Sequence, residues 1–260
     1  MIQRLIILIL FVMTIPARSE NLPTTRASTQ PYVLHLPGIG GEVPPDRTLV
    51  QGLAGVSSDI VIYDWTEKDS GIHALQATER NKKQAKLIAD DLTKRFRENP
   101  KREIYISSHS GGVGIAAWSL EALPDDVKIT RWLILAPGLS PKFDLSKALS
   151  HVSNNAHVFW SNRDALVLSV GTKTFGTIDG EYADAAGYVG FTRPAIGDAE
   201  QYKKLLQYPY DPNWIIYDHG GDHLGMMSHS FSKKILAPIL KNLPGRLAEP
   251  VQQAENKEQK

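Results

Sequence analysis

The sequence of 260 residues contains no cysteine, which excludes disulfide bonds, thiolate nucleophiles and cysteine-ligated metal centres. It also has no excess of charge of either sign, because 29 Lys and Arg residues against 28 Asp and Glu residues leave a formal net charge of +1. Proteins that bind nucleic acid need a basic excess to neutralise phosphates, so no nucleic-acid partner is expected. A hydrophobic content of 42% is typical of a globular protein and exceeds that of a disordered chain.

The N-terminal apolar stretch Leu5–Ile15 is shorter than the ~20 residues that a membrane-spanning helix needs. Arg4 precedes it, and the small residues Ala17 and Ser19 follow it, a pattern typical of a signal peptide that is cleaved after Ser19. An uncleaved anchor is the alternative. We expect a signal peptide over residues 1–19 and, after its removal, a periplasmic or secreted protein with no stable membrane span.

The rest of the chain divides into a polar linker at residues 20–30, one domain at 31–243, and a polar, disordered tail at 244–260. Within the domain, short apolar runs alternate with stretches of helical spacing. These patterns predict strands at 32–36, 60–63, 103–107, 130–135, 156–160 and 214–217, and helices at 46–56, 79–97, 116–120 and 230–240. Asp46 is expected to be the N-cap of the first helix. Such alternation predicts an α/β fold, with a mostly parallel sheet of about six strands and helices on both faces.

One serine stands where a strand turns into a helix, at the edge of the sheet where functional residues gather. Ser110 follows the strand predicted at 103–107, with small residues two before it, Ser108, and two after it, Gly112. This spacing is typical of a nucleophile elbow, whose turn is so sharp that bulky neighbours would clash. The following helix N-terminus and the Gly111 N–H would stabilise negative charge beside the serine.

A serine hydroxyl becomes a nucleophile only with a base within hydrogen-bond reach and a carboxylate that orients this base. Two histidines, His219 and His223, follow the last predicted strand, and Asp164 follows the strand predicted at 156–160. Asp222 is a weaker candidate, because its position next to His223 makes the ring nitrogen awkward to reach. The remaining minor candidates for the acid are Asp144 and Asp218.

This order of serine, aspartate and histidine along the chain resembles the α/β-hydrolase family, over most of residues 31–243. The elbow of that family reads Gly-x-Ser-x-Gly, and this chain has Ser108 in place of the first glycine. The resemblance implies the α/β-hydrolase fold without its first two strands. It also implies that Ser110 is the nucleophile, Asp164 the acid and His223 the base.

The resemblance also assigns an oxyanion hole, the pair of N–H groups that binds the negative oxygen of the reaction intermediate. In lipase-like members the loop after the first strand seen here reads His-Gly-x-Gly-Gly, and in this chain it reads Pro37–Gly41, with proline in place of histidine. Aligned in this way, the two donors are the backbone amides of Ile39 and Gly111.

The sequence therefore resembles a small, exported serine hydrolase of the esterase or lipase kind, which would cleave an ester or related acyl bond without a cofactor. Its substrate would be a small-molecule or lipid ester. A long aromatic-rich insertion at 166–212 is expected to form a wall or cap beside the site. Two other interpretations remain: a non-catalytic binding protein with the same fold, and a metal site. The side chains that would form the metal site are His219, Asp222, His223 and His229.

Overall fold

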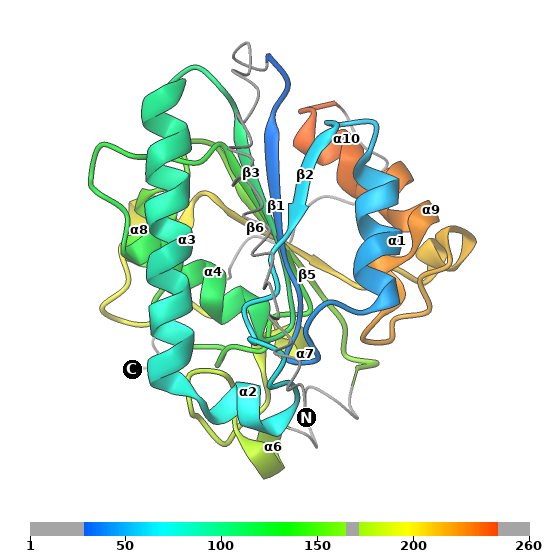
Figure 1. Cartoon of the computed structure of the whole chain (residues 1–260). Helices are drawn as coiled ribbons and strands as arrows, with labels where there is room; N and C mark the ends of the chain where they lie inside the picture. Colours follow the sequence, from blue (N-terminus) through cyan, green and yellow to red (C-terminus); the bar gives the residue numbers. More distant parts are fainter. Residues whose placement is uncertain (1–28, 165–171, 244–260) are drawn as a thin grey trace, which may run out of the picture.

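The computed structural model describes residues 29–164 and 172–243, which cover almost all of the predicted domain (Figure 1). The predicted signal peptide at 1–19 and the predicted tail at 244–260 lie outside the described residues, as does most of the predicted linker. Within the described residues, no helix combines the length and the apolar content that crossing a bilayer requires.

Six strands form a sheet in which every neighbouring pair is parallel, in the order β2-β1-β3-β4-β5-β6. The strands are β1 (Tyr32–Leu36), β2 (Asp59–Ile62), β3 (Ile104–His109), β4 (Arg131–Leu135), β5 (Ala156–Trp160) and β6 (Leu205–Pro209). The central strands β1, β3 and β4 are buried along their whole length, as expected when helices cover both faces of a parallel sheet. The predicted α/β architecture, with a parallel sheet of about six strands, is confirmed.

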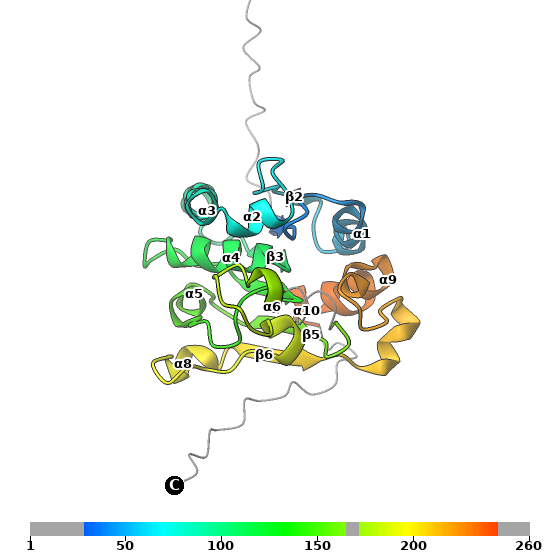
Figure 2. The same ribbon diagram turned by 90° about the horizontal axis from the view of Figure 1, so that it is seen from below.

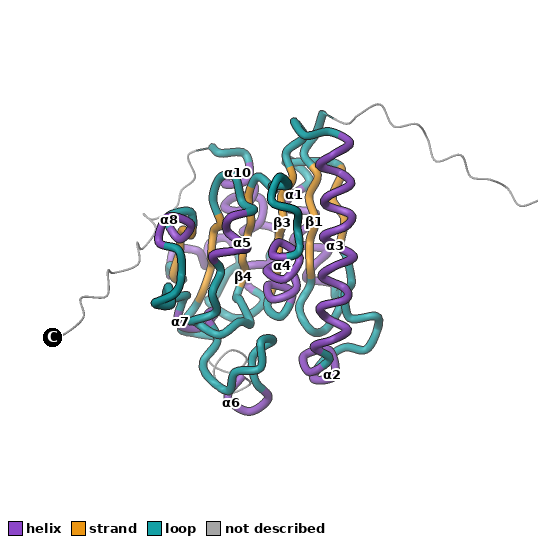
Figure 3. Tube along the Cα trace, turned by 90° about the vertical axis from the view of Figure 1, so that its left-hand side faces the viewer, coloured by secondary structure: helices purple, strands orange, loops and turns teal. Residues whose placement is uncertain are grey.

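Helices cover both faces of this sheet (Figure 1). One face carries α3 (Thr78–Glu98), α4 (Gly112–Glu121), α5 (Ser146–Ser150) and α8 (Ala199–Tyr202). The other face carries α1 (Pro44–Leu53) and the C-terminal helical run of α9 (His229–Phe231), η4 (Ser232–Leu236) and α10 (Ala237–Leu240). Figure 3 views the molecule from the side of α3 and α4, with the strands behind them.

Helical spacing in the sequence decides how these layers pack. The inward face of α3 consists of apolar residues three or four positions apart, Ala85, Ile88 and Leu92, which are at most 2% exposed. In contrast, α4 is apolar on nearly all sides, because it lies between the sheet, α3 and α5. This burial fixes the start of α4, and so the turn that carries Ser110.

Short helices gather at the carboxyl ends of the strands, the edge that faces the viewer in Figure 2. They are α2 (Ile72–Gln76), α6 (Thr172–Phe175) and α7 (Ala186–Val189). The Gly71 N–H, just before α2, donates to the Ile39 carbonyl at 2.7 Å, and the Gly187 N–H of α7 donates to the Pro137 carbonyl at 2.8 Å. These bonds fasten α2 and α7 to the loops that follow β1 and β4.

The strand predicted at 214–217 is wrong, because these residues belong to a 3₁₀ helix, η2 (Pro212–Tyr217). Asp211 caps its first turn, and the proline at its first position favours a helical start. Ile215 and Ile216 are 60% and 70% exposed, so this apolar run does not enter the core as a strand would. The sixth strand is instead β6, which lies inside the segment predicted as an insertion.

Two helices also differ in detail from their predictions. Asp46 is not the N-cap of the first helix, because α1 begins at Pro44 and the cap position belongs to Val43. The last helix runs from His229 to Leu240 as predicted within one residue, but its middle, η4, is a π-helix. Pro238 has no N–H to continue the regular hydrogen-bond pattern, which accounts for a local change of pitch. A further short 3₁₀ helix, η3, spans Gly225–Met227.

Candidate functional site

The turn between β3 and α4 gives Ser110 an unusual backbone conformation. Its φ of 53° lies in the left-handed region, which costs about 1–2 kcal/mol for a residue that has a Cβ atom. Main-chain bonds hold it there, since its N–H donates to Leu135 at 2.9 Å and its carbonyl accepts from Gly138 at 3.0 Å. The residue is 8% exposed, so its hydroxyl is held at the carboxyl edge of the sheet by a fixed backbone.

Small residues on either side of Ser110 are required by what lies against them. A Cβ atom on Gly112 would collide with the carbonyl oxygens at the end of β1, which pack against the start of α4. Ser108, where the family has glycine, is completely buried and its hydroxyl is satisfied. It accepts from Trp132 Nε1 at 2.8 Å and donates to the Leu133 carbonyl at 3.3 Å.

His223 reaches Ser110 from a loop 113 residues further along the chain. Its Nε2 lies 3.0 Å from Ser110 Oγ, and its Nδ1 lies 2.5 Å from a carboxylate oxygen of Asp164. Because a carboxylate only accepts, Nδ1 carries the hydrogen and Nε2 can accept the hydrogen of the serine hydroxyl. The structure thus brings the three residues predicted from the sequence into one hydrogen-bonded line.

Asp164 lies just beyond β5 and is only 4% exposed. Burial raises the pKa of its carboxyl group above the usual value, and the hydrogen bond from His223 opposes this effect. The three other candidate acids bind elsewhere. Asp144 accepts from the Ser146 N–H at 3.0 Å and Asp222 from the Leu224 N–H at 3.1 Å, so both bind the main chain of their own loops. Asp218 accepts from the Ser230 hydroxyl of α9 at 2.6 Å.

His109 lies beside the pair of Ser110 and His223, a contact that no sequence pattern indicates. Its Nε2 lies 3.0 Å from the main-chain oxygen of His223 and donates to it, and the two rings are 4.7 Å apart between centroids. Burial and the neighbouring His223 keep the pKa of His109 well below its usual value. The neutral ring therefore supports the loop of His223 and does not take the position of a base.

His219, the alternative base, is fully buried and lies away from solvent in a cluster of aromatic rings. Its Nδ1 accepts from the Gly221 N–H at 3.3 Å, and its Nε2 has no hydrogen-bond partner among the described residues. Burial lowers its pKa to about 4. The rings around it are those of Tyr210, Trp214 and Phe231.

The amides of Ile39 and Gly111, predicted as oxyanion donors, lie on two loops that meet at Ser110. A Cβ atom on Gly111 would lie 3.7 Å from the Ile39 nitrogen and would overlap the Ile39 side chain, so the two loops can approach only because this residue is glycine. Neither amide donates to another residue of the described chain. Within residues 29–164 and 172–243, both N–H groups therefore lack an acceptor, as two oxyanion donors would.

Gly138 is a further residue of the site that the sequence reasoning missed. A Cβ atom there would lie 3.1 Å from the Gly111 nitrogen and 3.1 Å from the Ser110 carbonyl carbon, closer than side chains normally approach. The available signal was the Pro-Gly pair directly after the strand predicted at 130–135. Glycine at this position leaves the Gly111 amide uncrowded.

The histidines and acids of the last loop do not form a metal-binding group. Among residues 29–164 and 172–243, no three His, Asp or Glu side chains come together in an arrangement that could hold a metal ion. Asp222 binds the main chain of its own loop, while His223 is directed to Ser110 and Asp164.

No protein-family model matches the sequence, and neither does any curated protein. Among solved structures, the chain is similar to a cutinase-like protein from Cryptococcus sp., with 11% identity and a TM-score of 0.44, over 84% of this chain and 98% of that chain. Aspergillus fumigatus lipase B is 13% identical, with a TM-score of 0.48, over 84% of this chain and 54% of that chain. The Pyrococcus horikoshii acylaminoacyl peptidase is 12% identical, with a TM-score of 0.47, over 86% of this chain and 39% of that chain. At this level of similarity, the function of this chain has to be inferred from the geometry of its own site.

Proposed function

We propose that the protein is a serine hydrolase that cleaves an ester or related acyl bond. The observation that carries this proposal is the hydrogen-bonded line from Asp164 through His223 to Ser110, at a turn with a left-handed backbone. A weak nucleophile, a base and a carboxylate that orients the base are the parts that acyl transfer to serine requires.

In the first step, Ser110 Oγ forms a bond to the carbonyl carbon of the substrate while its proton moves to His223 Nε2. The electron pair of the carbonyl double bond moves to the oxygen, which becomes negative. Asp164 stabilises the resulting imidazolium through its hydrogen bond to Nδ1. The 3.0 Å distance between the hydroxyl and the imidazole supports direct transfer of the proton.

The negative oxygen of the tetrahedral intermediate would be bound by the Ile39 and Gly111 amides, each worth about 3 kcal/mol of transition-state stabilisation. The N-terminus of α4 adds partial positive charge beside them. The intermediate then collapses, and the leaving alcohol takes the proton from His223. Water, deprotonated by the same imidazole, attacks the acyl group on Ser110 and releases the acid.

Exposed apolar side chains next to these residues favour a substrate with an apolar acyl or alkyl group. Leu224 directly follows His223 and is 46% exposed. Ile72 directly follows Gly71, whose N–H binds the Ile39 carbonyl, and is 41% exposed. Leu224 thus lies on the loop of His223, and Ile72 follows a residue that is bound to the loop of Ile39. Contact with an apolar chain would remove both side chains from water.

We also propose that the chain is exported, with cleavage of the leader between Ser19 and Glu20. The basis is the leader-like pattern of the first 19 residues. N-terminal sequencing of the protein recovered from the periplasm or medium should begin at Glu20. A protein that retains Met1 and stays in the membrane fraction would instead support the uncleaved anchor.

Hydrolysis of p-nitrophenyl esters with acyl chains of two to twelve carbons tests the proposed activity. The wild-type protein should release p-nitrophenol, and Ser110→Ala should lose at least about 1,000-fold in kcat/KM. Ser119→Ala is the matched control, because Ser119 is also a buried serine, bound only to its own helix at 2.7 Å. Equal turnover by the Ser110→Ala variant would refute Ser110 as the nucleophile, whereas a wild-type protein that hydrolyses none of the esters would favour a non-catalytic binding protein.

A further inference from the structure

The loop between β1 and α1 carries the Ile39 amide, but its own sequence gives it little rigidity. Three of its residues are glycines, which restrict the backbone least of all residues. Neighbouring elements hold it, since Trp65 Nε1 donates to the Pro37 carbonyl at 2.7 Å and the Gly71 N–H donates to the Ile39 carbonyl at 2.7 Å. These bonds fasten the first half of the loop, and the second half needs a hold of its own.

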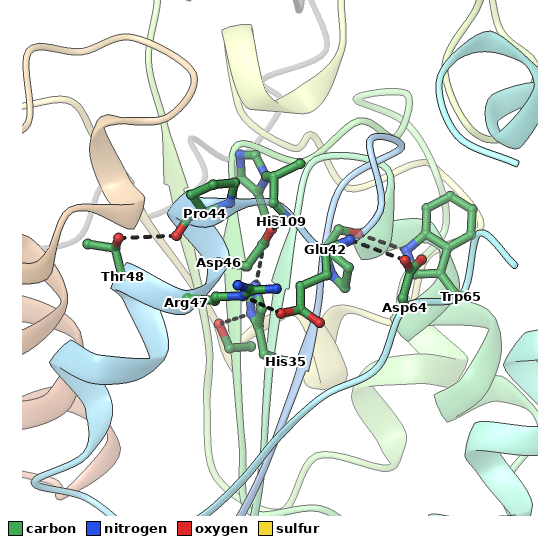
Figure 4. A network of polar contacts seen from close by, with 12 residues as sticks. His35, Glu42, Pro44, Asp46, Arg47, Thr48, Asp64, Trp65 and His109 are labelled. Atoms are coloured by element: carbon green, nitrogen blue, oxygen red, sulfur yellow. Dashed lines mark hydrogen bonds and ion pairs between the residues drawn. The ribbon is translucent and has the colours of Figure 1, made fainter. Parts of the chain in front are cut away.

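Two carboxylates supply that hold. Asp64 accepts from the Glu42 N–H at 3.3 Å, and Asp46, in the first turn of α1, binds the end of the loop. One of its carboxylate oxygens accepts from the Val43 N–H, the last residue of the loop, at 2.7 Å. The other lies 2.8 Å from His35 Nε2. Figure 4 shows the side chains of Asp46 and His35 joined in this network. Since a carboxylate only accepts, His35 donates from Nε2, and its Nδ1 lies 3.2 Å from the hydroxyl of Ser107.

This second set of serine, histidine and aspartate is sealed from solvent. His35, Asp46 and Ser107 are each 0% exposed, so no substrate can reach the Ser107 hydroxyl. The set instead joins three elements, because His35 lies on β1, Ser107 is its register partner on β3, and Asp46 lies on α1. Both strands end at the site: β1 leads into the loop of Ile39 and β3 into Ser110.

We propose that Asp46 and His35 are positioning residues for hydrolysis, which hold the loop at 37–43 so that the Ile39 amide stays beside the Gly111 amide. This inference depends on the proposed function. The two amides belong to loops in van der Waals contact, and misplacement of one by an ångström costs a large factor in rate. Asp46 and His35 do not touch the substrate, and they act only through the loop.

The chemistry of the network supplies a conservative variant. In Asp46→Asn the amide oxygen can still accept from Val43, and the amide NH₂ can donate to His35 Nε2. His35 then needs only to move its hydrogen to Nδ1, where the Ser107 hydroxyl can accept it. The bonds are retained without the negative charge, so this variant should keep the loop in place, whereas Asp46→Ala removes both bonds at once.

The experiment compares kcat, KM and the affinity for a trifluoromethyl ketone, which forms a tetrahedral adduct with an active-site serine. Asp46→Ala should lose at least about 10-fold in kcat and in ketone affinity, with KM within about 2-fold of wild type. Asp46→Asn should remain within about 3-fold of wild type. Asp46→Ala leaves His35 buried without its partner, which could destabilise the fold. A double variant, His35→Leu with Asp46→Leu, therefore replaces the pair by apolar groups. This folded double variant should show the same losses in kcat and in ketone affinity.

His151→Ala is the matched control for a merely structural role. His151 is also buried, and its Nδ1 lies 2.9 Å from the Val127 carbonyl near the amino ends of β4 and β5. This variant should lose thermal stability but keep its kcat and its ketone affinity.

The inference is overturned if folded Asp46→Ala and the double variant keep wild-type kcat and ketone affinity, or if His151→Ala loses as much of both. Ser110→Ala, assayed alongside, separates this failure from failure of the proposed function. An active Ser110→Ala variant overturns the proposed function and the inference with it. An inactive one beside fully active Asp46→Ala overturns the inference alone.

Discussion

Replacing Ser110 by glycine should make the protein more stable than replacing it by alanine. Both substitutions remove the hydroxyl and its bond to His223, so their difference isolates the backbone at a φ of 53°. A Cβ atom in this conformation costs about 1–2 kcal/mol, and the greater freedom of glycine in the unfolded chain offsets about 0.5–1 kcal/mol of the gain. The free energy of unfolding of Ser110→Gly should therefore be about 0.5–1 kcal/mol higher than that of Ser110→Ala.

The measurement is thermal unfolding of both variants under identical conditions, followed by circular dichroism. For a domain of this size, the difference corresponds to a midpoint about 1–4 °C higher for Ser110→Gly. Neither variant should hydrolyse esters. An alanine variant as stable as the glycine variant, or more stable, would refute the reasoning that the turn stores strain in order to present the hydroxyl.

Three further predictions concern pH, packing and metal. Burial lowers the pKa of His157 and of His219 to about 4, so below pH 6.5 the unfolded chain binds more protons than the folded one and stability falls as the pH falls. Each histidine should remove about 2 kcal/mol of stability between pH 7 and pH 5. Urea unfolding that gives the same free energy of unfolding at pH 7 and at pH 5 would contradict this. Gly138→Ala should lower kcat about 10-fold or more with little change in KM, because the Cβ atom of the alanine would crowd the Gly111 amide. If steady-state kinetics give an unchanged kcat, the Gly111 amide is not an oxyanion donor. Incubation with EDTA should leave ester hydrolysis unchanged, and a loss of rate restored by a divalent cation would favour the metal-dependent interpretation.

Local sequence patterns predict most of the fold. The first five strands follow from continuous apolar runs, because a parallel sheet covered on both faces buries every side chain of its central strands. The prediction of a sixth strand at 214–217 was wrong because a short apolar run does not distinguish a strand from a helical turn. The capping signal of Asp211 and the following proline indicated the helix correctly. The true β6, in an aromatic-rich segment, gave no comparable signal.

The site shows a similar division between local and distant information. A serine between small residues predicts the elbow, since that turn is a matter of local backbone sterics. The support around it depends on contacts between distant parts of the chain: His109 with the main chain of residue 223, and His35 with Asp46 and Ser107. The pattern also misplaced Asp46, which is not the N-cap of α1 but its third residue. From there its carboxylate binds the N–H of the cap residue Val43 and also His35, a contact that no local pattern indicates.

The most direct test of the central claim, that His223 activates Ser110, is labelling with a fluorophosphonate probe at pH 7, followed by mass spectrometry of the peptides. One adduct per chain is predicted, on the Ser110 hydroxyl, with labelling slowed at least about 1,000-fold in His223→Ala. An unlabelled wild-type protein, or an adduct on another serine, would contradict the account.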